Sequence, residues 1–452
     1  MGLYLLLAAP QLVRAQYGIE FPPLPSDTGP KRQRTIKILD RYPLMPSLPP
    51  AFTIPVGPLG FSVPGDNYLL RHQTLMSLDF LDEGRLLFTF RVSGLMQRDI
   101  SSNPKGTQQQ IKAMVVVVST GKVESQAEWI VPDRSRYVWM LNDGHFLLRV
   151  RDGLDEGDGD LKTTPSLRLP GHLLWIQMDP GQQFMVANSL ESADSAQKPG
   201  EPSSSATSQP TASEDPQKAG EQGVLVIRTL KRASGDVIHV SRAPWTLQNT
   251  DWPMNSDGYL ERVHEGSDHW LLKLNAYTGG DRALTRFDST CLPTYSYVSE
   301  TELLVTKCDP DNDNVGKLAA ISTHGESLWE VQTSTNAIWP LLVTSTNGLR
   351  VARETLLLKR SVERYKHRML SVRDFEGQMV RVFDAANGKV LLEAPLTPIL
   401  DAGGNVAISP SGQRVAILNR GAIQVFQLPA PPPLLMHTSG TSDPTPPAHN
   451  AQ

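Results

Sequence analysis

The sequence predicts an all-β fold made of repeated antiparallel units, and three observations carry this prediction. Apolar runs of a strand's length recur along the chain with polar turns between them. Glycine and proline are abundant, at 34 and 36 of 452 residues, which disfavours a helix bundle or a coiled coil. The strand and turn unit also recurs seven times. Although the chain exceeds an ordinary domain in length, large all-β architectures reach this size as one unit.

The first repeated element is a hairpin, in which a polar turn that usually contains glycine separates two apolar strands. Such turns supply the backbone geometry that a tight reversal between strands requires. The clearest examples join residues 75–81 to 86–90, 137–141 to 146–150, 173–178 to 184–187, and 406–409 to 414–418. Three less regular examples turn at Asp257-Gly258, Ser299-Glu300 and Asn347-Gly348.

A second hairpin follows several of the first, and its turn ends in glycine and a charged residue. This turn appears at Gly121-Lys122, Gly235-Asp236, Gly325-Glu326 and Gly388-Lys389. Two hairpins make one four-stranded unit. Residues 74–428, without a polar insertion at 190–222, allow about 46 residues for each of seven units, close to the period of propeller blades. We therefore expect a seven-bladed β-propeller of four-stranded antiparallel blades.

Three of these segments resemble the blade signatures of known propeller families. Residues 382–390 and residues 320–329 resemble blades of the WD-repeat and quinoprotein-like (PQQ-type repeat) propeller superfamilies, and the turn at 409–414 resembles the first turn of such blades. Most units lack the paired Trp-Asp of a true WD repeat. The resemblance implies the propeller fold. Quinoprotein dehydrogenases typically carry vicinal cysteines, which this chain lacks, so we predict no cofactor.

The composition divides the chain into four regions. Residues 1–15 resemble a signal peptide, residues 16–60 form a Pro-rich N-terminal arm, and residues 61–428 form the propeller. Residues 190–222 contain almost no large apolar side chain and are expected to be a disordered insertion, as is the Pro-rich tail at 429–452. A propeller must close its ring, and we expect residues 61–63 or 36–39 to add a strand to the blade that ends at Leu428.

The N-terminal segment predicts an extracytoplasmic protein, either periplasmic or secreted. A short apolar run at residues 3–9 precedes Val13 and Ala15, which have the small-residue spacing that signal peptidase recognises, although a basic start is absent. No apolar stretch has the roughly 20 residues that cross a bilayer, so we do not expect a membrane-spanning protein. With a net charge of −4, the chain lacks the basic character of a nucleic-acid binder.

Two cysteines, Cys291 and Cys308, are too few for a disulfide scaffold or a cysteine-based zinc cluster. A hairpin that turns between Ser299 and Glu300 would place them opposite each other, at a Cα separation of about 5 Å that suits a disulfide. Two buried free thiols are the alternative. Because the chain carries an export signal, we favour the disulfide.

Several motifs suggest metal binding but are incomplete. His264 and His269 are five residues apart, and the intervening glycine and serine favour a polar hairpin turn over a helical zinc site. Residues 155–160 and 309–314 supply clustered oxygen ligands of the kind that calcium uses. Neither segment completes an EF-hand pattern, so an acidic surface turn and a calcium site both remain open. We predict no metal ligand set.

Two further features suggest surfaces. Residues 359–368 form the densest basic run, which fits either a solvated loop or an anionic or protein-contact patch. The tryptophans fit either packing between blades or a carbohydrate-stacking surface. They are Trp129, Trp139, Trp175, Trp245, Trp252, Trp270, Trp329 and Trp339.

The sequence contains no phosphate loop, nucleophile elbow or zinc-protease motif, so we assign no catalytic residue and no cofactor-binding residue. The favoured function is a non-catalytic exported propeller that binds a protein partner or a small ligand at one rim of the channel. The alternative is a propeller enzyme, a hydrolase, lyase or quinoprotein-like oxidoreductase, with its site in the channel. Titratable groups from three or more blades at one channel mouth would favour the enzyme.

Overall fold

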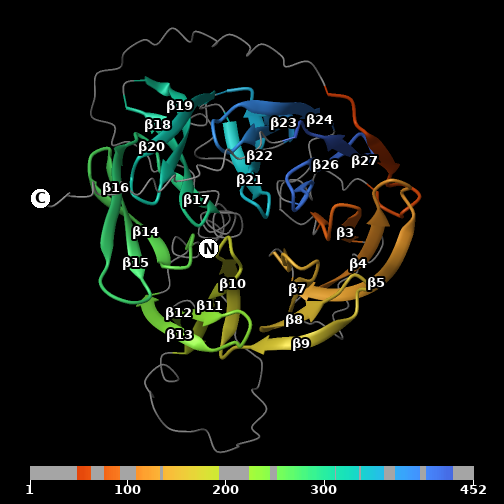
Figure 1. Cartoon of the computed structure of the whole chain (residues 1–452), viewed down its shortest axis with the longest axis horizontal. Coiled ribbons are helices and arrows are strands. Elements are labelled where there is room, and N and C mark those ends of the chain that lie inside the picture. The colour runs from red at the N-terminus through yellow and green to blue at the C-terminus, as the bar shows by residue number, and fades with distance from the viewer. Residues whose placement is uncertain are drawn as a thin grey trace, which may run out of the picture.

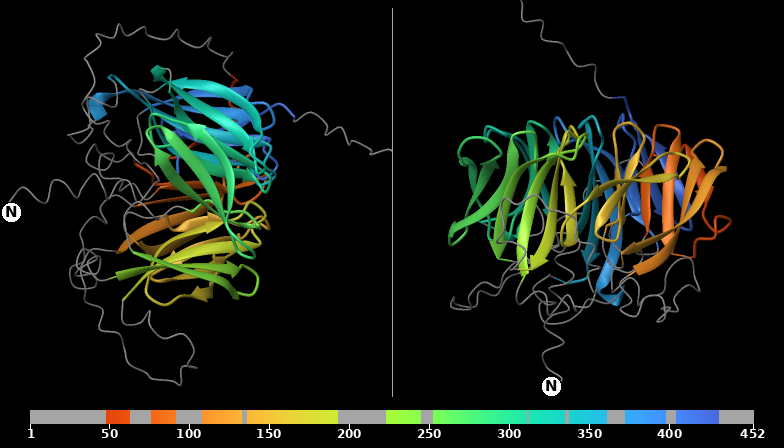
Figure 2. Two further views of the ribbon diagram at one scale, coloured as in Figure 1. Left: turned by 90° about the vertical axis from the view of Figure 1, so that its left-hand side faces the viewer. Right: turned by 90° about the horizontal axis from the view of Figure 1, so that it is seen from below.

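The computed structural model describes residues 48–62, 76–91, 108–132, 136–192, 223–244, 252–310, 312–334, 337–360, 372–397 and 404–430. Their strands form seven antiparallel sheets arranged as a ring, with the first strand of each sheet towards the centre (Figure 1). Seen from the side, the sheets form one thick disc (Figure 2). The predicted all-β, seven-bladed propeller is confirmed.

The blades follow one another in chain order. Blade 1 contains β2 (Ser77–Phe80), β3 (Arg85–Arg91), β4 (Gln108–Val117) and β5 (Val123–Pro132). Blade 2 contains β6 (Val138–Met140), β7 (Phe146–Val150), β8 (Gly153–Gly157) and β9 (Thr163–Arg168). Blade 3 contains β10 (His172–Met178), β11 (Phe184–Ser192), β12 (Gly223–Lys231) and β13 (Val237–Pro244). Blade 4 contains β14 (Gly258–Gly266), β15 (His269–Ala276) and β16 (Arg282–Asp288).

The remaining three blades complete the ring. Blade 5 contains β17 (Thr294–Ser299), β18 (Glu302–Asp309), β19 (Asn312–Ser322) and β20 (Ser327–Ser334). Blade 6 contains β21 (Ala337–Thr344), β22 (Arg350–Leu358), β23 (Phe375–Asp384) and β24 (Val390–Leu396), with a short 3₁₀ turn, η3 (Val372–Asp374), before β23. Blade 7 contains β25 (Val406–Ile408), β26 (Arg414–Asn419), β27 (Ala422–Gln427) and β1 (Phe52–Pro55).

Blade 4 departs from the four-stranded pattern. Among the described residues its sheet has three strands, and an isolated bridge between Met254 and Tyr259 takes the place of the innermost strand. The amide of Leu260 donates to the carbonyl of Pro253 at 2.7 Å. Because proline has no amide proton and cannot donate to a ladder, Pro253 explains why a regular first strand does not form.

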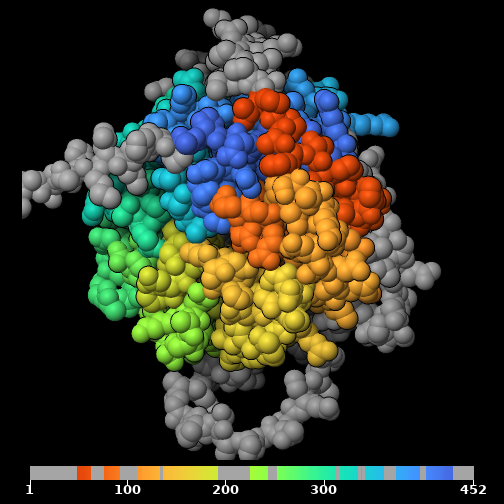
Figure 3. Space-filling view, turned by 45° about the vertical axis from the view of Figure 1, so that its right-hand side comes forward, coloured from red at the N-terminus to blue at the C-terminus, as the bar shows by residue number. Residues whose placement is uncertain are grey.

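The ring closes through β1, which pairs antiparallel with β27 from Phe52 opposite Val425 to Pro55 opposite Ala422. Figure 3 shows this N-terminal segment against the C-terminal blade. We expected the N-terminal region to supply the closing strand from residues 61–63 or 36–39, and the structure instead uses residues 52–55. Phe61 lies outside any strand, and residues 36–39 lie outside the described residues. The prolines around β1 disfavour a strand in the sequence, and for this reason it was not predicted. Pro55 is nevertheless tolerated, because it lies at the end of a strand on the outer edge of the sheet.

The predicted turns are found where the sequence placed them. Each of the seven first turns joins the first two strands of its blade, or joins the bridge to β14 in blade 4. Gly388 shows why glycine is required in the second type of turn. It has a φ of +70°, and a Cβ atom there would lie 2.5 Å from the ring of Trp329, whose Nε1 donates to the Ala385 carbonyl at 2.6 Å.

The polar insertion begins later than expected. Strand β11 continues through Leu190 to Ser192, where it pairs with the start of β12. Residues 193–222 lie outside the described residues, as do the predicted signal peptide, most of the N-terminal arm and the tail from residue 431.

The core is divided among the interfaces between neighbouring blades. The interface between blades 7 and 1 buries eighteen apolar residues, including Ile54, Phe88 and Phe90. The interface between blades 4 and 5 is thinner, with clusters of four and three buried residues around Leu260 and Leu272. Each apolar face is therefore covered by the next blade, and no blade buries both of its faces by itself.

We predict that Ile54→Ala lowers the free energy of unfolding by about 2–5 kcal/mol, because Ile54 is 3% exposed in the closing strand and its loss leaves a cavity. Urea denaturation measures the change. Thr53→Ala, at the exposed neighbouring position, is the control and should shift stability by no more than about 0.5 kcal/mol. Equal effects of the two substitutions would contradict closure through β1.

Candidate functional site

The first turns of the blades lie on one face of the ring, which we call the turn face. It consists of residues 81–85, 141–145, 179–183, 255–258, 299–302, 345–349 and 409–413. Hydrogen bonds join several neighbouring turns. The amide of Ser411 donates to Glu83 Oε1 at 2.7 Å, and Asn347 Nδ2 donates to the Ser411 carbonyl at 2.8 Å. The amide of Asn142 donates to Gln182 Oε1 at 2.8 Å.

Glu300 connects three blades on the turn face. Its carboxylate accepts the amide of Gly181 from blade 3 at 2.9 Å and the amide of Ser256 from blade 4 at 2.8 Å. Asn255 Nδ2 also donates to the Glu300 carbonyl at 3.2 Å. Hydrogen bonds from amides to a charged acceptor are stronger than neutral ones, so this turn of blade 5 holds blades 3 and 4 in place.

Asp179 of blade 3 forms a carboxyl pair with Glu300. Its side chain is 2% exposed, and the Phe184 amide donates to its Oδ1 at 2.6 Å. Burial raises the pKa of Asp179 to about 6, the Phe184 amide opposes this shift, and the neighbouring Glu300 adds to it. Two carboxyl groups in contact share a proton readily but repel each other when both ionise. Asp179 can therefore titrate near neutral pH.

Two buried tyrosines lie near this pair, Tyr277 close to Asp179 and Tyr297 close to Glu300. The Tyr277 hydroxyl also lies beside the buried hydroxyl of Thr229. Burial raises the pKa of both tyrosines, and the nearby carboxylates raise it further. The tyrosines are therefore neutral at physiological pH and add no charge beside the two carboxyl groups.

An enzyme would be favoured by titratable side chains from three or more blades at one channel mouth, and the Asp179 and Glu300 pair meets this condition only in part. Asp179 and Glu300 come from two blades, and the third blade contributes main-chain and amide groups. Both Glu300 oxygens accept amide hydrogens, which positions the carboxylate for holding the turns together. The sequence marked residues 299–300 as a turn, but it gave Glu300 no role because its partners are distant along the chain.

A second group of titratable side chains lies in blade 2. Asp143 and His145 flank Gly144 in the first turn, and Glu156 lies on β8. One ligand atom from each lies within 4.8 Å of the other two, and this is the only trio of that kind among the described residues. His145 Nδ1 is 3.2 Å from Asp143 Oδ1, and each side chain is about half exposed.

The predicted calcium segments are not assembled into one ligand set. Asp155 forms an ion pair with Arg168 at 2.6 Å, while Asp158 Oδ1 accepts the amides of Asp160 and Lys162 at 3.0 Å. In the second segment, Asp309 pairs with Lys317 at 3.0 Å, and residue 311 lies outside the described residues. The described aspartates of these segments form ion pairs with arginine or lysine side chains, or accept hydrogen bonds from main-chain amides.

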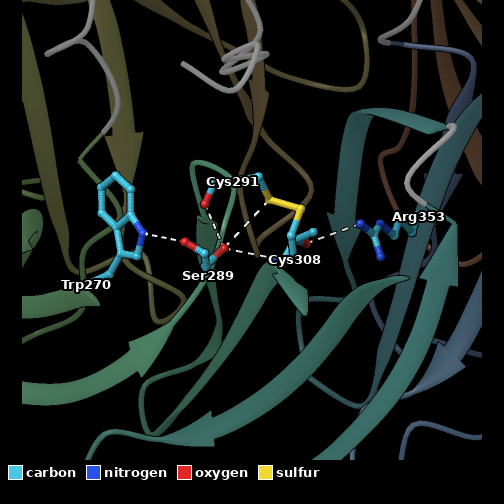
Figure 4. The surroundings of a disulfide bond; sticks show 6 residues. Trp270, Ser289, Cys291, Cys308 and Arg353 are labelled. Carbon is cyan, nitrogen blue, oxygen red and sulfur yellow. Dashed lines mark hydrogen bonds between the residues drawn. A yellow bond between two sulfur atoms is a disulfide. The ribbon is translucent and has the colours of Figure 1, made fainter. Parts of the chain in front are cut away.

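Cys291 and Cys308 are joined in a disulfide with a Cα separation of 5.5 Å (Figure 4). The hairpin turns at Glu300 rather than between Ser299 and Glu300, since Tyr297 pairs with Leu303, and Cys291 lies before β17 in the connection from blade 4. Buried Ser289 organises this connection. Its Oγ donates to the Cys291 carbonyl at 2.6 Å and accepts the Cys308 amide at 3.0 Å. The disulfide therefore reinforces the thin interface between blades 4 and 5.

His264 and His269 form the predicted hairpin turn between β14 and β15 and do not share a ligand position. His264 Nε2 contacts the Ser267 carbonyl at 2.7 Å, while His269 Nδ1 contacts Asp288 Oδ1 at 2.7 Å. His269, without His264, lines a shallow pocket together with Trp270, Arg286 and Asp288.

The described tryptophans support packing between blades. Trp129, Trp139, Trp252 and Trp270 are buried, and Trp175 and Trp329 are half-buried. Trp245 and the side chain of Trp339 lie outside the described part of the structure. Of the basic run, Lys359 and Arg360 are exposed and residues 361–368 lie outside the described part of the chain.

The outer edge of blade 3 is apolar and exposed. Strand β13 pairs with β12 on one side and with no strand of the described chain on the other. Val237, Ile238 and Val240 on this strand are 49%, 37% and 40% exposed. These are three of the five large apolar residues that are exposed in the described part of the chain. Figure 1 shows β13 on the perimeter of the ring.

Comparisons with known proteins give similarity of fold only. No protein-family model matches the chain, and no curated protein matches it in sequence. Among solved structures, Pyrococcus horikoshii acylaminoacyl peptidase is 12% identical with a TM-score of 0.43 over 79% of this chain and 50% of its own. This chain therefore spans about half of that peptidase. The C-terminal WD40 domain of Sif2 is 9% identical with a TM-score of 0.42 over 85% of this chain and 99% of its own.

An uncharacterised protein of Listeria monocytogenes, lmo1340, is 8% identical with a TM-score of 0.43 over 79% of this chain and 95% of its own. At such values the similarity carries no information on activity, and the propeller assignment rests on the seven sheets described above. The type of repeat stays a prediction. None of the helices in the described ranges has the length and apolar character to cross a membrane.

We predict that the Asp179 and Glu300 pair makes stability depend on pH. Because the pKa of Asp179 rises to about 6 on folding, its stabilising contribution is complete below its ordinary pKa near 3.8 and is lost as pH rises through about 6. Asp179→Asn keeps the Phe184 acceptor and offers Glu300 a donor. It should raise the melting temperature at pH 8 and flatten its dependence between about pH 4 and 6. A lower melting temperature for this variant at pH 8 would contradict the pairing.

We predict that the disulfide contributes about 3 kcal/mol to stability, because it closes a loop with a sequence separation of 17. Guanidinium denaturation of the Cys291→Ser and Cys308→Ser double variant, compared with the oxidised protein, measures this difference. Peptide mapping without reduction is the control for the bond itself. Two thiols that react freely with an alkylating reagent in the native protein would refute it.

Proposed function

We propose that the protein is an exported, non-catalytic propeller that binds a protein partner, and that the partner adds an extended strand to the outer edge of β13. The observation that carries this proposal is the exposure of three apolar side chains, Val237, Ile238 and Val240, in the first half of that edge strand. The surface lies on the perimeter of the ring rather than at the rim of the channel.

Comparison of the seven outer strands supports this choice. An exposed edge strand offers unpaired main-chain groups to other chains, and proteins protect such edges with charges, prolines and bulges. The other outer strands carry a proline, or charged residues within the strand: Pro55 in β1, Glu124 and Glu128 in β5, Pro165 in β9, Arg282 and Arg286 in β16, Glu330 in β20, and Glu393 and Pro395 in β24. Strand β13 also carries a charge and a proline, Arg242 and Pro244, but they lie in its second half, and its first five residues, Val237 to Ser241, contain neither.

The side chains of β13 divide between the ring and the solvent. His239 and Ser241 face blade 4, where His239 Nε2 contacts Ser241 Oγ at 3.0 Å and Ser241 Oγ contacts the Tyr259 hydroxyl at 3.2 Å. Ile238 and Val240 are free to contact a partner. An added strand would gain main-chain hydrogen bonds from the edge and specificity from these apolar side chains, which is the usual mode of β-strand addition. The partner is therefore an extended protein segment with apolar side chains at alternate positions.

Export is the second part of the proposal. Its support is the N-terminal segment, with its apolar run and small-residue spacing, and the pair of cysteines, since disulfides persist in oxidising compartments. Fractionation of the native host, followed by alkylation of free thiols before lysis, tests it. Recovery of the protein in the cytoplasm with both thiols free would reject export and leave the edge proposal intact.

Hydrogen exchange with a peptide probe tests the edge. The probe is a synthetic peptide with the sequence of residues 236–242, because this segment already has the alternating character of an edge-pairing strand. We predict slower exchange of the β13 amides when the peptide is present. Val240→Lys should abolish this protection, because a charge in the middle of the edge opposes pairing.

Leu328→Lys on β20 is the matched control, since Leu328 is an exposed apolar residue of another outer strand, with 43% of its surface accessible. It should leave the protection of β13 unchanged, and a peptide of scrambled sequence should give none. Equal protection of β20 and β13, or protection that survives Val240→Lys, would reject β13 as the docking strand. Concentration-dependent dimerisation that is lost in Val240→Lys would identify a second copy as the occupant.

A further inference from the structure

The first turn of blade 2 presents three side chains of the kind that bind divalent metal ions. Asp143 and His145 project from the turn, and Glu156 projects from the end of β8, the third strand of the same sheet. The pairing of β7 with β8, which sets Leu147 opposite Glu156, brings this end of β8 to the turn. Three ligand atoms from two separate elements therefore meet within 4.8 Å.

The spacing of two of these ligand atoms fits a shared ion. His145 Nδ1 is buried and faces the Asp143 carboxylate. Asp143 Oδ1 lies 3.2 Å from it, close enough for an ion pair but outside hydrogen-bond geometry. Two ligands of a tetrahedral ion, each bonded at about 2.0–2.1 Å, are about 3.3 Å apart. The separation of Nδ1 and Oδ1 is thus the separation that a shared ion requires.

We infer that Asp143, His145 and Glu156 form a binding site for a divalent transition-metal ion, with Zn²⁺ as the best match. One imidazole and two carboxylates suit Zn²⁺, whereas Ca²⁺ takes six to eight oxygen ligands. Asp143 and His145 are each about half exposed, so water can complete the coordination. The site goes beyond the proposed function and is independent of β13.

The surroundings keep the ligands available. The main-chain amide and the imidazole of His145 lower the pKa of Asp143 against the opposing effect of burial, and the charge of Arg232 lowers it further. Arg232 is itself held by the Gln182 carbonyl, to which its Nε donates at 2.8 Å. The Asp143 carboxylate is therefore ionised at neutral pH. A bound ion would fix the first turn of blade 2 against the third strand of that blade.

Isothermal titration of the tag-free, chelator-treated protein with ZnCl₂ alone tests the site. We expect one equivalent to bind, and we expect His145→Asn and Glu156→Gln each to weaken binding by about tenfold or more. Substitution with Co²⁺ gives a second readout, since its visible spectrum reports coordination by nitrogen and oxygen.

His172→Asn is the matched control. His172 Nδ1 also contacts an aspartate, Asp152 Oδ1 at 2.8 Å, but the pair has no third ligand in the described structure. This variant should bind Zn²⁺ as the unmodified protein does. Circular dichroism confirms that each variant folds. Absence of binding at millimolar ZnCl₂, or stoichiometric binding that survives both His145→Asn and Glu156→Gln, would overturn the inference.

Discussion

Coverage of each blade by its neighbours is the constraint on which the rest of the structure depends. Every apolar cluster in the described core lies between two sheets, so a blade without a neighbour would expose one face. The first and last blades would share this problem if the ring were open. Strand β1 solves it by joining blade 7, and the largest apolar cluster forms where blades 7 and 1 meet. The fold is therefore cooperative around the whole ring, unlike an open solenoid.

The ring is uneven, and blades 4 and 5 show how polar interactions compensate for reduced apolar packing. Blade 4 lacks a regular innermost strand and shares small clusters with blade 5. At this interface the Glu300 carboxylate accepts amides from two blades, and on the connection between the blades Ser289 and the disulfide hold the chain in place. Covalent and charge-assisted bonds are concentrated where the apolar clusters are smallest.

Local patterns predicted the fold well, because a turn is specified by a few adjacent residues. Polar turns, most of them with a glycine, identified the first turn of every blade, and their recurrence gave the number of blades. The closing strand was missed because its four residues end in Pro55 and its partner lies at the other end of the chain. Buried charges were missed for the same reason. Arg350 and Glu354 are buried in β22, and their partners are distant along the chain, Asp384 in β23 and Asn405 in the segment before β25.

For the candidate sites too, local sequence patterns located the residues, whereas contacts between distant residues could not be predicted. The sequence identified the two cysteines and the turns that carry Asp143, His145 and Glu300, but a role for these residues depends on what the fold brings beside them. Glu156 belonged to a segment considered for calcium, and its partners are instead the residues of a neighbouring turn. The apolar edge of β13 was not recognised, because Val, Ile and Val in a strand are as typical of a buried strand as of an exposed one.

The position of β1 has a consequence for how the chain acquires its structure. During synthesis β1 emerges before any blade, but its partner β27 is among the last strands to be made. Until then the early blades can pair locally, yet blade 1 has no blade 7 to cover it. Contacts between the two ends of a chain form slowly, because closing a long loop must precede any gain from the contact. Completion of the ring is thus a late event, and the unfinished protein exposes Phe88 and Phe90 to whatever surrounds it.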